Sequence, residues 1–128
     1  MIVIDASAVI AILLEERGYE GLAERLRAAD ERVMSPVSTV EVVMALARRF
    51  SEPSVIADGY LRRSAISVHP TDDDQAYWAQ QAFLTYGKGR HPARLNLGDC
   101  FSYAAAKALN APLLYVGGDF AKTDIRAA

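Results

Sequence analysis

Four acidic side chains are the residues of this sequence best suited to chemistry: Asp5, Glu41, Asp99 and Asp119. Two carboxylates about 4 Å apart repel each other by roughly 4 kcal/mol at an effective dielectric of about 20, so a group of them takes up protons or binds a cation. A set of oxygen ligands suits Mg²⁺ or Mn²⁺, and no cysteine and histidine cluster favours zinc. The acids predict a divalent-metal site, with Asp5 and Asp99 as direct ligands and Glu41 and Asp119 completing it.

Two of these acids are expected to follow strands. Residues 1–4 are an apolar run that predicts a buried strand, and Asp5 separates it from an alanine- and leucine-rich helix expected over residues 6–14. Asp119 follows a strand expected over residues 112–116. In parallel sheets ligands bind beyond the carboxyl ends of the strands, so we expect both acids at that edge.

The other two acids are expected at helix starts. Ser38 and Glu41 have the spacing of a capping box that places Glu41 at the third helical position, and Asn96 and Asp99 have similar spacing. An acid in a first helical turn also interacts favourably with the helix dipole, so each acid alone has a structural explanation. Four acids at successive strand ends and helix starts of one sheet are nevertheless expected to face one cleft.

Strand and helix patterns alternate along the whole chain. Further helices are expected over residues 19–29, 40–50, 55–64, 71–86 and 97–109, and further strands over residues 32–35 and 65–68. Thr71 with Asp74 predicts the cap of the helix that ends near Gly87. This alternation predicts an α/β domain with a mostly parallel sheet, and residues 1–128 have the length of a single domain.

The bulk composition excludes several classes of protein. The 16 acidic and 14 basic residues give a formal charge of −2, so net charge alone does not argue for nucleic-acid binding. The longest uncharged apolar stretch, residues 6–14, is too short to span a bilayer, and the amino terminus does not resemble a secretory signal. A single cysteine, Cys100, agrees with a reducing compartment. We therefore expect a cytoplasmic protein with no membrane partner.

Two smaller features accompany the acids. The loop before the helix at residue 97 carries Lys88, Arg90 and Arg94, which are suited to phosphate contacts, although such a loop is by default simply solvated. Ser7 lies two residues after Asp5, where its hydroxyl is expected either to support a ligating carboxylate from the second shell of a metal or to satisfy an early helix amide. The two roles of Ser7 are compatible.

Five motifs together make the whole chain resemble the PIN-domain nucleases, and among them the VapC toxins of toxin–antitoxin pairs. The motifs are residues 4–8 (IDASA), 38–41 (STVE), 87–93 (GKGRHPA), 97–101 (LGDCF) leading into 103–107 (YAAAK), and 118–124 (GDFAKTD). Each fragment is weak alone, but their shared order and spacing are highly specific.

The resemblance implies a PIN-like three-layer α/β/α domain around a mostly parallel sheet of four to five strands. It implies an Mg²⁺-dependent endoribonuclease, with Mn²⁺ able to substitute, whose acidic quartet matches Asp5, Glu41, Asp99 and Asp119. It also implies a VapB-type antitoxin that covers the active site, and a toxin homodimer. The sequence departs from the family at Gly118, where many relatives carry a second acidic or amide residue, so Asp124 is an alternative to Asp119.

Four other interpretations remain open from the residues. A metal-independent ribonuclease would use His69 and His91 as acid and base. A phosphoryl-transfer domain would use Asp5 as nucleophile, although Ser7 stands where a second aspartate would be expected. Cys100 with a histidine would form a thiol nucleophile. In a noncatalytic binding module the acids would only cap helices.

Overall fold

The sheet at the centre of the molecule has four parallel strands. The computed structural model describes all 128 residues. Strands β1 (Ile2–Ile4), β2 (Arg32–Met34), β3 (Ile66–Val68) and β4 (Leu113–Leu114) are arranged in the order β3-β2-β1-β4. The helices are α1 (Ala6–Leu13), α2 (Tyr19–Ala28), α3 (Pro36–Leu46), α4 (Pro53–Arg63), α5 (Asp73–Tyr86) and α6 (Leu97–Ala108), followed by the short helix η1 (Phe120–Lys122). The predicted α/β order is confirmed.

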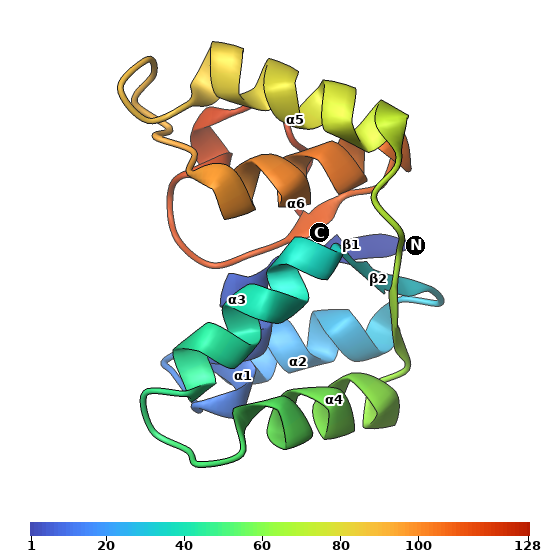
Figure 1. Cartoon of the computed structure of the whole chain (residues 1–128). Coiled ribbons are helices and arrows are strands. Elements are labelled where there is room, and N and C mark those ends of the chain that lie inside the picture. The colour runs from blue at the N-terminus through green and yellow to red at the C-terminus, as the bar shows by residue number, and fades with distance from the viewer.

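Helices cover both faces of this sheet, which gives the expected three layers. Figure 1 shows α5 and α6 on one side of the strands and α1 to α4 on the other. The central strand β1 alternates between the two layers, because Ile2 and Ile4 belong to the core with α1 to α4 and Val3 to the core with α5 and α6. The carboxyl end of β1 therefore lies between the two helical layers, and Asp5 is the next residue.

Helix α3 begins three residues earlier than a Ser38 cap would allow. Ser35 is the N-cap, its hydroxyl accepts a hydrogen bond from the backbone N–H of Val37, and Pro36 occupies the first helical turn. Proline is favoured there because its ring fixes a helical φ and its missing N–H would lack a partner. The predicted capping box of Ser38 with Glu41 is therefore wrong, and both residues lie inside the helix on neighbouring turns.

A second predicted cap also lies elsewhere. Asp72, rather than Thr71, caps α5, since its carboxylate accepts a hydrogen bond from the backbone N–H of Gln75. Strand β4 is shorter than expected, and the carboxyl terminus runs beside it through a parallel bridge between Leu113 and Ala127. No helix of the structure has the length and apolar character needed to cross a membrane.

Candidate active site

Asp5 is the buried centre of the site. Its side chain is held where β1 meets α1, and the residue is 5% exposed. Oδ2 of Asp5 accepts hydrogen bonds from the backbone N–H of Ser7 at 3.0 Å and from its hydroxyl at 2.6 Å. Oδ1 accepts a hydrogen bond from the hydroxyl of Ser102, on α6, at 2.5 Å. Asp5 thus caps a helix and is also fixed in a single orientation.

Ser7 serves both the carboxylate and the neighbouring strand. Its hydroxyl donates to Asp5 and accepts a hydrogen bond of 3.0 Å from the backbone N–H of Val116, just beyond β4. Ser7 therefore supports Asp5 as the sequence suggested, and it also links the loop after β4, which leads to Asp119, to the start of α1.

Glu41 points from α3 toward the start of α6. Its carboxylate lies against the backbone of Gly98, in the first turn of α6, where a Cβ atom would overlap it. Oε1 of Glu41 is buried and has no hydrogen-bond partner in the structure. Burial raises the pKa of Glu41 to about 7, and repulsion by Asp5 and then Asp99 acts in the same direction.

Asp99 combines a helix cap with a place beside the other acids. Its Oδ2 accepts a hydrogen bond from the backbone N–H of Asn96 at 3.0 Å, and the Asn96 side chain accepts one from the N–H of Asp99 at 2.9 Å. This capping box confirms the prediction for α6. Burial raises the pKa of Asp99 to about 6; the Asn96 hydrogen bond opposes the rise, while Asp5 and Asp119 add to it.

Asp119 is the outermost acid of the group. It is exposed, it precedes η1 and its side chain makes no capping hydrogen bond. The negative charge of Asp119 repels that of Asp99 and helps to raise the pKa of Asp99. The alternative residue, Asp124, is engaged elsewhere, because its carboxylate accepts hydrogen bonds from the Tyr103 hydroxyl at 2.8 Å and from Lys107 Nζ at 2.5 Å. Between the two, the geometry favours Asp119 as the fourth acid.

The group of acids has the character of a hard-cation site that uses few direct ligands. No three Asp, Glu, His or Cys side chains lie close enough together to hold an ion directly. Mg²⁺ typically takes only one or two carboxylates and keeps several waters, so this spacing suits it. The unpartnered Oε1 of Glu41 and the raised pKa values of Glu41 and Asp99, caused by burial first and then by neighbouring acids, show that ionising these carboxylates is unfavourable unless a cation is present.

The basic loop precedes α6, the helix that carries Asp99, and its three cationic side chains are exposed. Backbone hydrogen bonds from Lys88 to Leu95 and from Leu95 to Tyr86 close its base. Lys88, Arg90 and Arg94 line a shallow concavity on it. The guanidinium of Arg90 is partly committed, since it donates to the carbonyl of Leu84 and lies 5.6 Å from the centre of the Phe83 ring.

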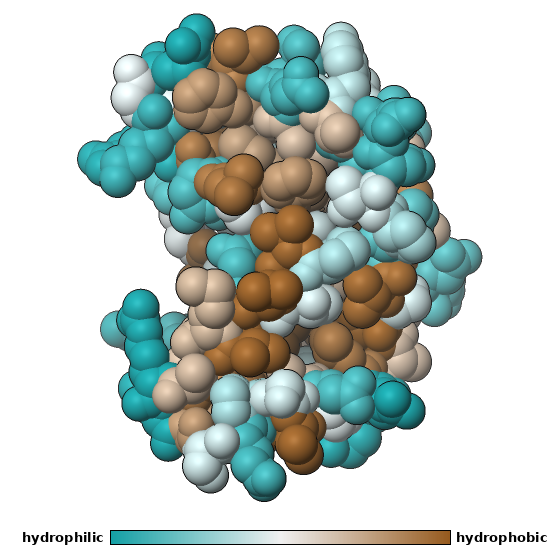
Figure 2. All heavy atoms as spheres, viewed as in Figure 1, coloured by the Kyte–Doolittle hydropathy of each residue, from teal (hydrophilic) through white to brown (hydrophobic).

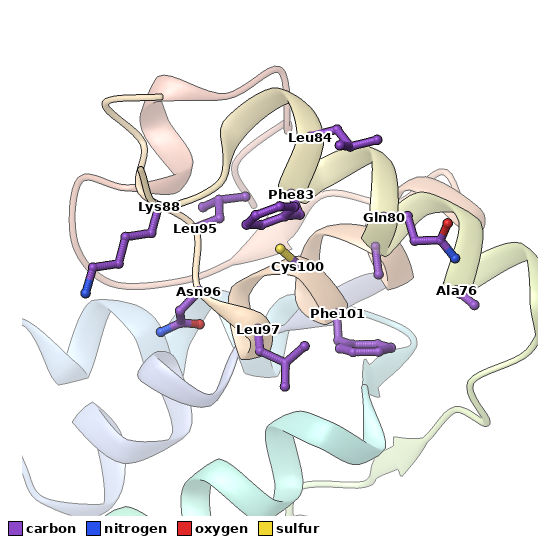
Figure 3. Close-up of a pocket in the computed structure, with 11 residues that line it drawn as sticks. Ala76, Gln80, Phe83, Leu84, Lys88, Leu95, Asn96, Leu97, Cys100 and Phe101 are labelled. Atoms are coloured by element: carbon purple, nitrogen blue, oxygen red, sulfur yellow. The ribbon is translucent and has the colours of Figure 1, made fainter. Parts of the chain in front are cut away.

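A mostly apolar groove reaches Asn96 at the start of α6, but the four acids do not line it. It has a volume of about 620 Å³ and runs between α5 and α6, as Figure 3 shows. Its walls are mostly apolar, with Phe83, Leu95 and Phe101 among the lining residues, while Lys88 and Asn96 lie at one end. Because Asn96 is bonded to Asp99, this groove borders the acidic site without supplying chemical groups to it.

The histidine and cysteine alternatives lack suitable geometry. Cys100 is buried, and burial, followed by the charge of Asp99, raises the pKa of its thiol to about 11, so the reactive thiolate is disfavoured. Nδ1 of His91 accepts a hydrogen bond from the backbone N–H of Ala93 in the basic loop, whereas His69 contacts Gln75 at the start of α5. The two histidines therefore lie in separate local networks.

The sequence analysis missed the supporting roles of three residues: Ser38, Ser102 and Gly98. Ser38 is one helical turn before Glu41, and Ser102 is one turn after Asp99. This three-residue spacing places a hydroxyl on the same helix face as each acid, which was the available signal. Gly98 gave no signal, because its role depends on a side chain from another helix.

Comparisons with known proteins agree with this fold. The PIN domain family model matches residues 2–126. Ribonuclease VapC30 of Mycobacterium tuberculosis is 44% identical over 124 residues, which cover 96% of this chain and 95% of that protein. Among solved structures, VapC20 of M. tuberculosis, described as a sarcin-ricin loop cleaving toxin, has a TM-score of 0.78 at 20% identity and covers 100% of this chain and 98% of its own. A toxin–antitoxin complex from Klebsiella pneumoniae has a TM-score of 0.73 at 17% identity, and the match covers 97% of this chain and 93% of that one.

Proposed function

Because this chain belongs to the PIN-domain family, as a full-length relative of the VapC ribonucleases, we propose that it is the ribonuclease toxin of a toxin–antitoxin pair and hydrolyses RNA phosphodiester bonds with a divalent cation. The proposed site consists of Asp5, Glu41, Asp99 and Asp119. The observation that carries the metal dependence is the buried, unpartnered Oε1 of Glu41, whose pKa is raised to about 7 by burial first and then by the charges of Asp5 and Asp99. A cation relieves both conditions at once.

Each acid has a distinct role in this proposal. Asp5 and Asp99 would hold the cation directly, because each is oriented by hydrogen bonds and keeps an oxygen lone pair that no donor occupies. Glu41 and Asp119 would complete the site through water molecules. When bound, the cation would place positive charge against the scissile phosphate and make a water molecule a better nucleophile. Mg²⁺ is the cation we assign, with Mn²⁺ able to replace it.

The basic loop positions the RNA in this account. Lys88, Arg90 and Arg94 bind phosphates away from the scissile bond. Lys88 and Arg94 are freer for this task than Arg90, whose guanidinium donates to the carbonyl of Leu84. Such contacts make binding sensitive to salt although the chain carries a net charge of −2. The expected products are a 5′-phosphate and a 3′-hydroxyl.

Two protein partners complete the proposal. A VapB-type antitoxin covers the acids, which is consistent with the likeness to a toxin–antitoxin complex. A second copy of the chain covers an apolar surface that includes Val40, Met44, Leu84 and Leu97, each at least half exposed. Figure 2 shows hydrophobic side chains gathered across the middle of the molecule, where α3 and α6 lie side by side. A patch of this kind is typical of a protein interface.

The homodimer is tested by sedimentation of the purified chain and two α5 variants. Leu84→Glu places a charge on the proposed interface, so we expect a shift from dimer to monomer. Tyr77→Glu is the matched control, since Tyr77 is equally exposed on α5 but lies outside the apolar groove, and it should leave the dimer intact. A wild-type protein that is monomeric at micromolar concentration would contradict the dimer and leave the enzymatic proposal standing.

The enzymatic proposal is tested by RNA cleavage with Mg²⁺, with Mn²⁺ and with excess chelator. Wild type is compared with Asp5→Asn and Asp99→Asn, and growth inhibition by each variant is measured in parallel. We expect cleavage with either metal, none with chelator, and loss of both activities in the variants. Cleavage that persists in chelator, or a fully active Asp99→Asn, would overturn the metal mechanism.

A further inference from the structure

A chain of two buried serines ends on the carboxylate of Asp5. The hydroxyls of Ser38, on α3, and Ser102, on α6, lie 3.0 Å apart, and the Ser102 hydroxyl donates to Oδ1 of Asp5 at 2.5 Å. Both serines are 0% exposed. Serine in a helix commonly bonds to a carbonyl of its own preceding turn, as the neighbouring Thr39 does with the carbonyl of Pro36 at 2.7 Å. The hydroxyl of Ser38 instead crosses to another helix.

The direction of this chain follows from the number of protons. An ionised carboxylate only accepts hydrogen bonds, so the single hydroxyl proton of Ser102 is donated to Asp5. Ser38 must then be the donor in the bond between the two serines. Both hydroxyl dipoles point toward Asp5, an arrangement in which each hydrogen bond strengthens the next.

Counting lone pairs identifies the oxygen of Asp5 that is left for a ligand. A carboxylate has about four lone-pair positions. The N–H and hydroxyl of Ser7 occupy both positions on Oδ2, and Ser102 occupies one on Oδ1. One position therefore remains, and it is on Oδ1.

Resting on the proposed function, we propose that Ser102, supported by Ser38, is a positioning residue that presents the open lone pair of Asp5 Oδ1 to the cation. Ser102 lies one turn after Asp99 and Ser38 one turn before Glu41, so the same bonds tie the two helices that carry these acids. Removing either hydroxyl leaves the orientation of the Asp5 carboxylate less restricted, while all four acids are retained. Supporting groups of this kind typically change metal affinity 10- to 100-fold.

The test measures Mn²⁺ affinity of the full chain by titration calorimetry, without RNA and independently of activity. We expect Ser102→Ala to weaken Mn²⁺ binding by at least about tenfold and Ser38→Ala by a smaller factor, because Ser38 acts through Ser102. Thr39→Val is the matched control, since it removes a hydroxyl of α3 that bonds only within its own helix, and its affinity should equal that of wild type. Thermal unfolding in chelator reports whether each variant folds.

The outcomes separate this inference from the function on which it rests. If Ser102→Ala and Ser38→Ala unfold at lower temperature but bind Mn²⁺ as wild type does, the serines are merely structural and the inference is overturned. If Ser102→Ala does not fold, the affinity of Ser38→Ala decides in the same way. Wild type that binds no Mn²⁺ would instead refute the proposed metal site.

Discussion

The inner acid of the site, Asp5, and the outer acid, Asp119, differ greatly in burial and in the hydrogen bonds that hold them. Asp5 is 5% exposed and accepts three hydrogen bonds from serines of two helices. Asp119 is exposed, follows the Gly117–Gly118 turn and accepts no capping hydrogen bond. A buried ion needs fixed partners, whereas an exposed one is stabilised by water. In the proposed metal site, the fold would therefore fix Asp5 before a cation binds, whereas Asp119 would be ordered only by the bound cation and substrate.

The largest expected effect comes from neutralising the inner acid. Asp5→Asn removes a proposed direct ligand and places an amide N–H₂ against serine hydroxyls that donate to the carboxylate in wild type. We expect kcat/KM for RNA to fall by more than roughly 100-fold, the upper range for supporting groups. Asp119→Asn should lower kcat/KM for RNA by about tenfold, in the lower part of that range. Equal losses in the two variants, measured with one RNA at saturating Mg²⁺, would remove the distinction between inner and outer acids.

Two glycines, Gly98 against Glu41 and Gly118 next to Asp119, allow a buried and an exposed part of the site to be compared by substitution. Gly98→Ala forces a methyl group into the Glu41 carboxylate, and overpacking of this kind costs about 1–3 kcal/mol. Gly118→Ala meets open space next to Asp119. We expect Gly98→Ala to lose most RNA cleavage and to unfold at lower temperature, while Gly118→Ala resembles wild type. A fully active Gly98→Ala would show that the position of Glu41 is not critical.

The pH dependence of stability should depend on the inner acids. The pKa of Glu41 is about 7 in the folded chain against an ordinary 4.5, so the folded state holds its proton more tightly than the unfolded one. In the metal-free protein this group contributes stability at low pH that is lost as the pH rises from about 4.5 to 7. The charge of Mn²⁺ favours the ionised forms of the acids around it, so the stabilisation by Mn²⁺ should be larger at pH 8 than at pH 5.5.

Thermal unfolding with Mn²⁺ and with chelator across this pH range measures the effect. Asp5→Asn serves as the control, because it removes one of the charges that raise the pKa of Glu41. The pH dependence of the metal-free variant should be shallower than that of wild type. An increase in unfolding temperature with Mn²⁺ that is the same at pH 5.5 and pH 8 would contradict a site made of these carboxylates.

The smallest expected effect lies farthest out, in the basic loop. Lys88→Ala removes one exposed cation and no ligand, so RNA binding should weaken for every sequence alike. The slope of log affinity against log salt should fall by about 0.7, the value for one phosphate contact on a single strand. Fluorescence anisotropy at several salt concentrations checks this, with Lys122→Ala, an exposed lysine of η1, as the control. An unchanged slope would remove Lys88 from the RNA path.

Local patterns in the sequence predicted the order of strands and helices well, but not every helix start. The apolar runs predicted the four strands, and Asn96 with Asp99 predicted the cap of α6. The cap of α3 was mistaken because the apolar period was followed only from residue 40, whereas the helix begins at Pro36. The serine chain and the contact of Gly98 with Glu41 join helices that are distant in sequence, and helical spacing alone does not say which faces meet.

The chemistry of the cut RNA ends tests the central claim most directly. A short RNA, cleaved by wild type with Mg²⁺, is analysed by mass spectrometry. Water activated at the acidic site leaves a 5′-phosphate and a 3′-hydroxyl, and chelator or Asp5→Asn should abolish both products. A 2′,3′-cyclic phosphate that forms in the presence of chelator would show attack by the 2′-hydroxyl and contradict the metal-dependent account.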